Sequence, residues 1–242
     1  MTYCIGILVA EGLAMLADTR TNAGVDNVSS YRKLRLIENR ADRLIVLASA
    51  GSLSTTQSAL ERLRLGLADP ETGEMATLRE APSIYAAAML AGRALAAART
   101  DMASLQAEDI NFDATFLIGG AIGGEPMRLF LVYAAGNAIE CGIETPYLQI
   151  GENKYGKPIL DRALAHDTPL TDAIKTALIS FDSTMRSNLA VGLPIDVMIA
   201  RRGAGEAVTK RIGEDDAYFH DLSQRWADAL AQARAAIPDP PY

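Results

Sequence analysis

Histidine and cysteine are scarce in this chain, with two of each among 242 residues. The cysteines, Cys4 and Cys141, have no paired spacing, which argues against a disulfide framework and against a four-ligand zinc site. Two histidines are too few for a multi-histidine metal centre and disfavour a Ser–His–Asp hydrolase. Asp26, Glu152 and Asp196 show no metal-ligand spacing either, so we expect no metal ion.

Long apolar runs and clusters of positive charge are also missing. No apolar run reaches the roughly 20 residues that a membrane-spanning helix needs. The net charge is −7 and no stripe of Lys and Arg stands out, which argues against binding to nucleic acid. The first residues lack a basic region, a signal peptide and a propeptide. We therefore expect a cytoplasmic protein that neither spans nor binds a membrane.

The residues that are abundant indicate a sizeable core, because 49% are hydrophobic and 22% are charged. The opening segment is apolar on both alternating faces. Tyr3, Ile5 and Ile7 share one face, and Cys4 and Leu8 share the other. A strand that is apolar on both faces is covered on both faces. The sequence thus predicts a buried first strand.

The remaining patterns predict runs of strands that alternate with helices. No linker divides the chain, so we expect one domain over residues 1–236 and a loose tail over 237–242. This order is typical of a layered α+β fold with two sheets inside and helices outside. Strands are predicted at 2–10, 13–18, 34–38, 43–50, 112–120, 127–133, 138–142, 147–150, 194–200 and 206–212, and helices from about 52 to 67, 82 to 100, 157 onward, 170 to 186 and 216 to 235.

Thr2 is the first candidate catalytic residue. A threonine hydroxyl is a weak nucleophile until a base takes its proton. An N-terminal threonine carries its own base, since a free α-amine has a pKa of about 7.7–8.0. Removal of Met1, which small second residues permit, would expose that amine. By itself, a threonine at this position is more often only a terminal residue, so the case depends on other segments.

Four further segments support a role for Thr2. They are Thr2-Tyr-Cys-Ile-Gly-Ile7, Leu16-Ala-Asp-Thr-Arg-Thr21, Tyr31-Arg-Lys-Leu34 and Ala48-Ser-Ala-Gly51. Together they resemble the proteasome β-subunit and its bacterial relatives, which are N-terminal-nucleophile hydrolases with a four-layer αββα sandwich. Through residues 21–26, 150–158 and 185–189, the sequence is most similar within that family to Anbu, the ancestral β-subunit group of bacteria.

The resemblance implies a role for each of four residues. Thr2 would be the nucleophile after Met1 is removed. Lys33 would hold a positive charge beside Thr2 and lower the pKa of its amine and hydroxyl. Asp18 would pair with Lys33 and fix its position. The Gly51 amide would stabilise the tetrahedral oxyanion, an effect of about 3–4 kcal/mol in known cases.

Other positions carry over with departures from the family pattern. The family's Arg-Asp-x-x-Ser-Gly segment corresponds to 186–192 here, where Ser187 or Asn188 replaces the aspartate and Ala190 stands at a serine position. Asn153 likewise stands where a serine is usual. Arg20 is a further supporting residue. The first specificity pocket is expected to be formed by Asn22, Ser49 and Leu53.

The implied function is hydrolysis of amide or peptide bonds through an acyl-enzyme on Thr2, in a homo-oligomeric ring or open helical ring, without a cofactor. Two alternatives stay open. In the first alternative, the chain is a catalytically weak scaffold subunit. In the second, it is an amidase that acts on small amides. Residues 151–158 nearly match a phosphate-binding loop, but Pro158 replaces the hydroxyl residue that would bind Mg²⁺, which disfavours nucleotide binding.

Overall fold

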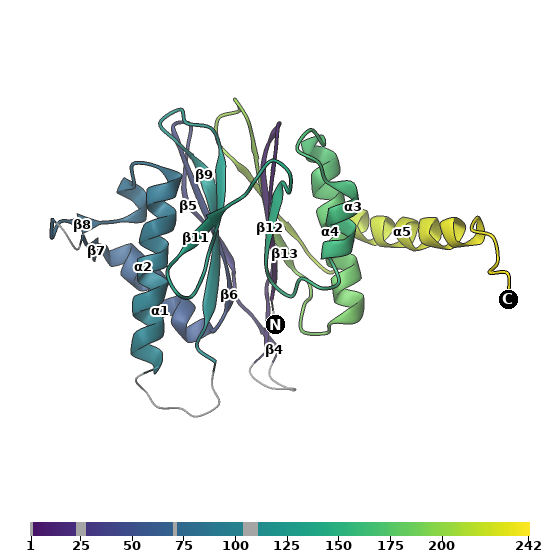
Figure 1. Cartoon of the computed structure of the whole chain (residues 1–242), viewed down its shortest axis with the longest axis horizontal. Helices are drawn as coiled ribbons and strands as arrows, with labels where there is room; N and C mark the ends of the chain where they lie inside the picture. Colours follow the sequence, from purple (N-terminus) through teal and green to yellow (C-terminus); the bar gives the residue numbers. More distant parts are fainter. Residues whose placement is uncertain (1, 23–27, 70–71, 104–110) are drawn as a thin grey trace.

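Two five-stranded antiparallel sheets form the centre of the molecule (Figure 1). The computed structural model describes residues 2–22, 28–69, 72–103 and 111–242. In spatial order, the first sheet contains β12 (Tyr147–Gly151), β1 (Tyr3–Val9), β2 (Gly12–Asp18), β13 (Ile195–Arg201) and β14 (Val208–Ile212). The second contains β11 (Ala138–Glu140), β10 (Arg128–Val132), β9 (Ala114–Ile122), β6 (Arg43–Gly51) and β5 (Leu34–Arg40).

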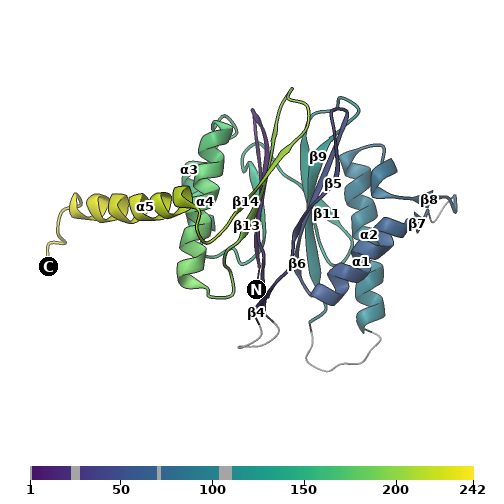
Figure 2. The same ribbon diagram turned by 180° about the vertical axis from the view of Figure 1, so that it is seen from behind.

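Helices cover the outer face of each sheet (Figures 1 and 2). The helices α1 (Leu53–Leu65) and α2 (Ile84–Ala103) pack on the second sheet. The helices α3 (Lys157–Ala163) and α4 (Leu170–Ser187) pack on the first sheet. The layers follow the order helix, sheet, sheet, helix, which confirms the predicted αββα sandwich. The last helix, α5 (Ala217–Ala235), projects away from this body.

The longer predicted helices and strands are confirmed, whereas several short elements were not predicted. They are β3 (Arg20–Asn22), β4 (Val28–Ser30), β7 (Leu67–Ala68), β8 (Met75–Ala76) and a 3₁₀ turn (Leu78–Glu80). Each has two or three residues, which is too few for an alternating pattern to be visible in the sequence. The pairing of β3 with β4 carries the chain from the end of β2 toward Lys33.

The first strand is buried on both faces, as its composition predicts. Tyr3, Ile5 and Ile7 pack against α3 and α4 in one hydrophobic cluster. Cys4 packs on the opposite side, in the cluster between the two sheets. A strand held on both faces has little freedom to move, so the residue just before it, Thr2, has a fixed position.

Local sequence explains where two of the helices begin. Ser52 caps α1, since its side chain accepts a hydrogen bond from the Thr55 amide. Asp216 caps α5 in the same way, accepting from the Phe219 amide at 2.9 Å. Such caps satisfy backbone donors that the first helical turn leaves unpaired. The cap at Ser52 matters for the site because it directly follows Gly51.

The backbone of helix α2 lies close to the second sheet at Gly92. A Cβ atom at Gly92 would lie 2.1 Å from the carbonyl oxygen of Gly136, which is in the turn between β10 and β11. Backbone atoms cannot move aside as a flexible side chain can. The absence of a side chain at Gly92 therefore sets the distance between α2 and the sheet.

The Gly92→Ala variant is expected to be less stable than the wild type. Helix propensity alone would favour alanine by about 1 kcal/mol. The clash with Gly136 should reverse that sign and cost about 1–3 kcal/mol, as overpacking does. Thermal unfolding midpoints at equal protein concentration test this, with Gly142→Ala as control because no atom lies within 4 Å of a Cβ there. A higher midpoint for Gly92→Ala would contradict the proposed packing.

Candidate active site

Thr2 directly precedes the first residue of β1 and borders a cavity of about 480 Å³. It is 8% exposed, and its carbonyl oxygen accepts a hydrogen bond of 2.6 Å from the Glu152 amide. The cavity is also lined by Lys33, Ser49 and Gly51. These residues come from both sheets, so the site is formed at the junction between them.

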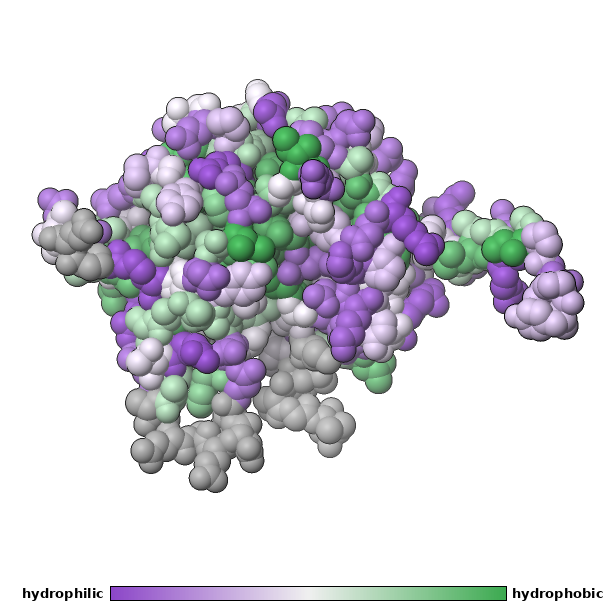
Figure 3. Space-filling model, in the orientation of Figure 1, coloured by the Kyte–Doolittle hydropathy of each residue, from purple (hydrophilic) through white to green (hydrophobic). Residues whose placement is uncertain are grey.

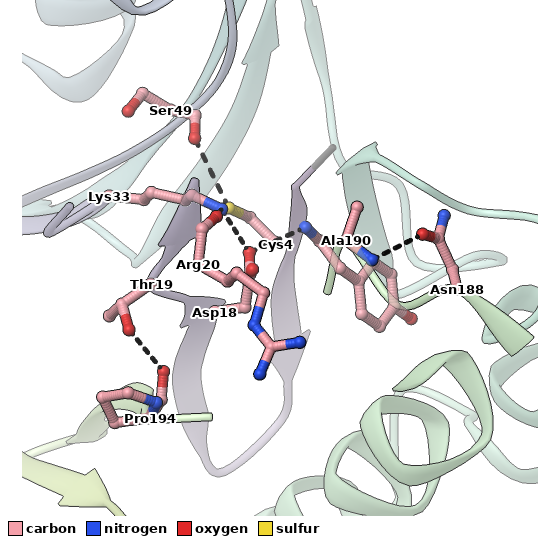
Figure 4. Close-up of polar contacts among 10 residues, drawn as sticks. Cys4, Asp18, Thr19, Arg20, Lys33, Ser49, Asn188, Ala190 and Pro194 are labelled. Atoms are coloured by element: carbon pink, nitrogen blue, oxygen red, sulfur yellow. Dashed lines mark hydrogen bonds and ion pairs between the residues drawn. The ribbon is translucent and has the colours of Figure 1, made fainter. Parts of the chain in front are cut away.

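Lys33 and Asp18 form a buried ion pair beside Thr2 (Figure 4). The Lys33 Nζ atom lies 2.7 Å from Asp18 Oδ1 and 2.7 Å from the carbonyl oxygen of Arg20. Asp18 Oδ1 also accepts a hydrogen bond of 2.9 Å from the Tyr3 amide. The pair thus connects the end of β2, the segment before β5 and the start of β1.

Two opposing effects act on the Asp18 carboxyl. Burial raises its pKa, because Asp18 is fully buried and the charged form loses hydration. The Lys33 ammonium and the amides of Tyr3 and Gly192 lower the pKa. Burial is the larger effect, so the pKa of Asp18 is raised overall, and the contact with Lys33 offsets only part of the cost of keeping a charge in this position.

The start of β1 is anchored by the Tyr3 side chain. Its hydroxyl accepts a hydrogen bond of 2.6 Å from Gln149 Nε2 and lies 3.1 Å from Ser180 Oγ. The Tyr3 ring packs against Phe181 of α4, with ring centroids 4.6 Å apart. Tyr3 is therefore fixed from both the sheet and the helix, and Thr2 is held with it.

Gly51 ends β6 at the cavity wall. Its φ angle is 101°, a conformation that side-chain-bearing residues rarely adopt. A Cβ atom here would lie 2.3 Å from the carbonyl oxygen of Asp113. Glycine at this position thus allows both the positive φ angle and the close approach to the Asp113 carbonyl, and it lines the same cavity as Thr2.

Arg20 holds a neighbouring loop in place. Its guanidinium donates a hydrogen bond of 2.8 Å to the carbonyl oxygen of Leu189 and packs on Gly192, where a Cβ atom would lie 2.6 Å from Arg20 Cζ. Its own carbonyl accepts from Lys33. Arg20 thus connects the ion pair to the segment that follows α4.

The remaining supporting residues differ in burial and in contacts. Asn188 donates to Glu152 Oε2 at 3.0 Å and accepts from the Ala190 amide at 3.0 Å (Figure 4 shows the second contact). Ser187 is the exposed last residue of α4. Asn153 is exposed as well. The residue before Asn153, Glu152, is buried. The sequence analysis did not include Glu152 among the expected site residues.

Two of the three expected pocket residues line the cavity. Ser49 is buried, and its carbonyl accepts from the Cys4 thiol at a sulfur–oxygen distance of 3.6 Å. Leu53 lies at the cavity edge, 38% exposed. The side chain of Asn22 is outside the described part of the structure. Sequence reasoning missed Thr21 and Tyr31, which also line the cavity.

Among the residues that the structure describes, no group of three His, Cys, Asp or Glu side chains is placed to hold a metal ion. Within the same residues, none of the helices combines the length and the apolar character needed to cross a membrane. Cys4 and Cys141 are both free thiols.

The Asp18→Asn variant is expected to lose about 3–5 kcal/mol of stability, because it leaves the Lys33 ammonium buried without a carboxylate. Thermal unfolding of the two proteins measures the loss. The double variant Asp18→Asn/Lys33→Met should recover much of it, since no charge is then buried. Glu61→Gln is the control, because it breaks the exposed Glu61–Arg64 pair and should leave the midpoint unchanged. An unchanged midpoint in Asp18→Asn would contradict a tightly coupled pair.

Comparison with known proteins places this architecture in a family. No family model matches the sequence, and no curated protein matches it. Solved structures do match. A Gly-1 mutant of Anbu from Hyphomicrobium sp. strain MC1 is 44% identical, with a TM-score of 0.89 and 100% of both chains covered. Anbu (ancestral beta-subunit) from Yersinia bercovieri is 43% identical, with a TM-score of 0.86, and the match covers 99% of this chain and 100% of that one.

A third structure, the helical assembly of the Anbu complex from Pseudomonas aeruginosa, is 39% identical with a TM-score of 0.87, and the match covers 99% of this chain and 98% of that one. Identity of this size over the whole chain, together with the shared sandwich, settles the relationship. The chain belongs to the Anbu (ancestral β-subunit) family of proteasome-like proteins.

Proposed function

We propose that this protein is a cytoplasmic N-terminal threonine hydrolase, which cleaves amide or peptide bonds after Met1 has been removed. The observation that carries the proposal is the shared cavity of Thr2, Lys33 and Gly51, with Lys33 paired to buried Asp18. The proposed nucleophile, a positive charge held by an ion pair and a glycine backbone then line one space of about 480 Å³. The two free thiols suit a reducing compartment.

In the proposed reaction, the Thr2 α-amine takes the proton of the Thr2 hydroxyl as its oxygen attacks the substrate carbonyl. The Gly51 amide stabilises the resulting oxyanion. The amine then gives the proton to the leaving nitrogen, which leaves an ester on Thr2. Water hydrolyses that ester with the same amine as base. Lys33 lowers the pKa of the amine, because a nearby cation disfavours protonation, so the amine can release the proton that it takes up.

Substrate selection is assigned to the cavity walls. Ser49 and Leu53 line the cavity together with Thr21 and Tyr31. Three of these side chains carry a hydroxyl group and the fourth, Leu53, is apolar, so none of the four carries a formal charge. The proposed substrates therefore present an uncharged side chain to this part of the site, and peptides or small amides both meet that requirement.

Labelling with a threonine-directed epoxyketone or β-lactone tests the reaction. Intact-protein mass spectrometry is expected to show the loss of Met1 and the gain of one adduct, because the free amine activates Thr2. Thr2→Ser should retain the adduct and Thr2→Ala should lose it completely. A free Thr2 amine without an adduct would contradict the proposed activity and favour the scaffold alternative. Retained Met1 would contradict the processing step.

We also propose that the protein assembles with copies of itself through α5. The Anbu complex of Pseudomonas aeruginosa forms a helical assembly. In this chain, Phe219 and Leu222 attach α5 to the body, and Leu230 continues the same stripe of the helix at 50% exposure. Ile237, just beyond the end of the helix, is 69% exposed. Figure 3 shows hydrophobic atoms, in green, on the projecting arm. An apolar stripe that leaves the body is suited to contact a second subunit.

The assembly is tested with Leu230→Asp, which places a charge in the exposed part of the stripe. Analytical ultracentrifugation should show a multiple of the 25.8 kDa chain for the wild type and a smaller species for the variant, because burial of an unpaired charge is unfavourable. Gln232→Asp adds the same charge on the opposite face of α5 and should leave the assembly intact. Equal sizes for all three proteins would exclude α5 from the interface.

A further inference from the structure

Glu152 is a buried carboxylate without a cationic partner. It is 8% exposed and follows directly after β12. Its Oε1 atom accepts from the Lys154 amide and its Oε2 atom from the Asn188 side chain, both at 3.0 Å. Both donors are neutral. Among the residues that the structure describes, no Lys, Arg or His forms an ion pair with Glu152.

The other buried carboxylates behave differently. Within the described residues, Asp18 pairs with a lysine, and Asp182 and Asp196 each pair with an arginine. Buried charges in proteins are almost always paired, because desolvation of a lone charge is costly. Glu152 is therefore the exception in this chain, and its lack of a cation calls for a physical reason.

Strand pairing brings Glu152 to the nitrogen of Thr2. Tyr3 pairs with Gly151 between β1 and β12, so the next position places Thr2 opposite Glu152, and the Glu152 amide donates to the Thr2 carbonyl at 2.6 Å. Successive backbone N–H groups of a strand point to opposite edges. The Tyr3 amide donates to Asp18 on the β2 side. The Thr2 nitrogen is thus directed toward the other edge, where Glu152 lies.

Removal of Met1 moves the terminal ammonium group to Thr2. Hydrolysis of the Met1–Thr2 bond consumes one water, releases methionine together with the ammonium that Met1 carried, and converts the uncharged amide nitrogen of Thr2 into an amine that binds a proton. The net charge of the chain does not change, but the positive charge now lies on the residue opposite Glu152. Glu152 is the one buried carboxylate that no cation neutralises among the described residues.

We propose that Glu152 is a positioning residue that binds the α-ammonium of Thr2 after Met1 is removed and so holds the terminus in place. This role rests on the proposed function, because Glu152 acts through the amine and not on the substrate. Asn188 fixes the Glu152 carboxylate, and the Ala190 amide fixes Asn188 in turn. The loops after β12 and after α4 together form this support.

The other groups around Thr2 do not supply the same contact. Asp18 already accepts from Lys33 and from the Tyr3 amide. The positive charges of Lys33 and Arg20 repel an ammonium group. Burial raises the pKa of the Cys4 thiol, which keeps Cys4 neutral at physiological pH. Besides Glu152, several charged or titratable residues lie on the elements around Thr2. They include Asp18 on β2, Arg20 on β3, Lys33 before β5, Tyr31 after β4 and Cys4 on β1.

A thermal-unfolding cycle tests the contact without relying on catalysis. Wild type and Glu152→Gln are each prepared with Met1 retained, through inhibition of methionine aminopeptidase, and with Met1 removed. In the processed form, Glu152→Gln should lower the midpoint by about 2–4 °C. With Met1 retained, it should leave the midpoint unchanged or raise it, since it removes an unpaired charge. Exposed Glu144→Gln is the control. Equal shifts in both forms would overturn the proposal.

The pH dependence of β-lactone labelling gives a second readout that a purely structural role would not move. A carboxylate beside the amine raises the amine pKa, so Glu152→Gln should lower it. The acidic limb of the labelling rate is then expected to shift by about one pH unit toward lower pH. An unshifted limb would overturn the role of Glu152. If the wild type is not labelled at all, the proposed function fails, and the thermal cycle still decides on the contact.

Discussion

The buried ion pair between Lys33 and Asp18 is the interaction on which the architecture of the site depends. Asp18 ends a strand of the first sheet, and Lys33 directly precedes β5 of the second, so this contact joins the two sheets at the cavity. Through the Tyr3 amide it also fixes the start of β1. Charges withdrawn from water are tolerated only in well-defined geometry. The pair therefore stabilises one arrangement of three chain segments.

Rigidity around Thr2 comes from packing as well as from charge. The strand that follows Thr2 is buried on both faces, and Tyr3 is held by hydrogen bonds from the sheet and by a ring contact from α4. Hydrolysis through a terminal amine requires that amine, hydroxyl and oxyanion donor keep their relative positions. A terminus would ordinarily be one of the least ordered parts of a chain. Here Thr2 directly precedes a strand that packing holds on both faces.

A carboxylate and an amide from two separate loops meet near the start of the first strand. In the structure, the side-chain amide of Asn188, at the end of α4, donates to the carboxylate of Glu152, which follows β12. The Ala190 amide holds Asn188 in turn. This contact therefore depends on the relative position of two loops that are far apart in the sequence.

Much of this architecture is determined by the sequence alone. Alternating apolar residues in the first strand, the caps at Ser52 and Asp216, and the order of long elements follow from local physics, and the four segments around Thr2, Asp18, Lys33 and Gly51 carry the family resemblance. The tertiary structure decided which side chains meet. At the end of β12, side chains alternate between two faces, so a one-residue difference turns Glu152 inward and leaves Asn153 exposed. The short strands β3 and β4, likewise, are defined by their pairing with each other, between the end of β2 and Lys33. Contacts between distant segments depend on such registers, and a local pattern does not contain them.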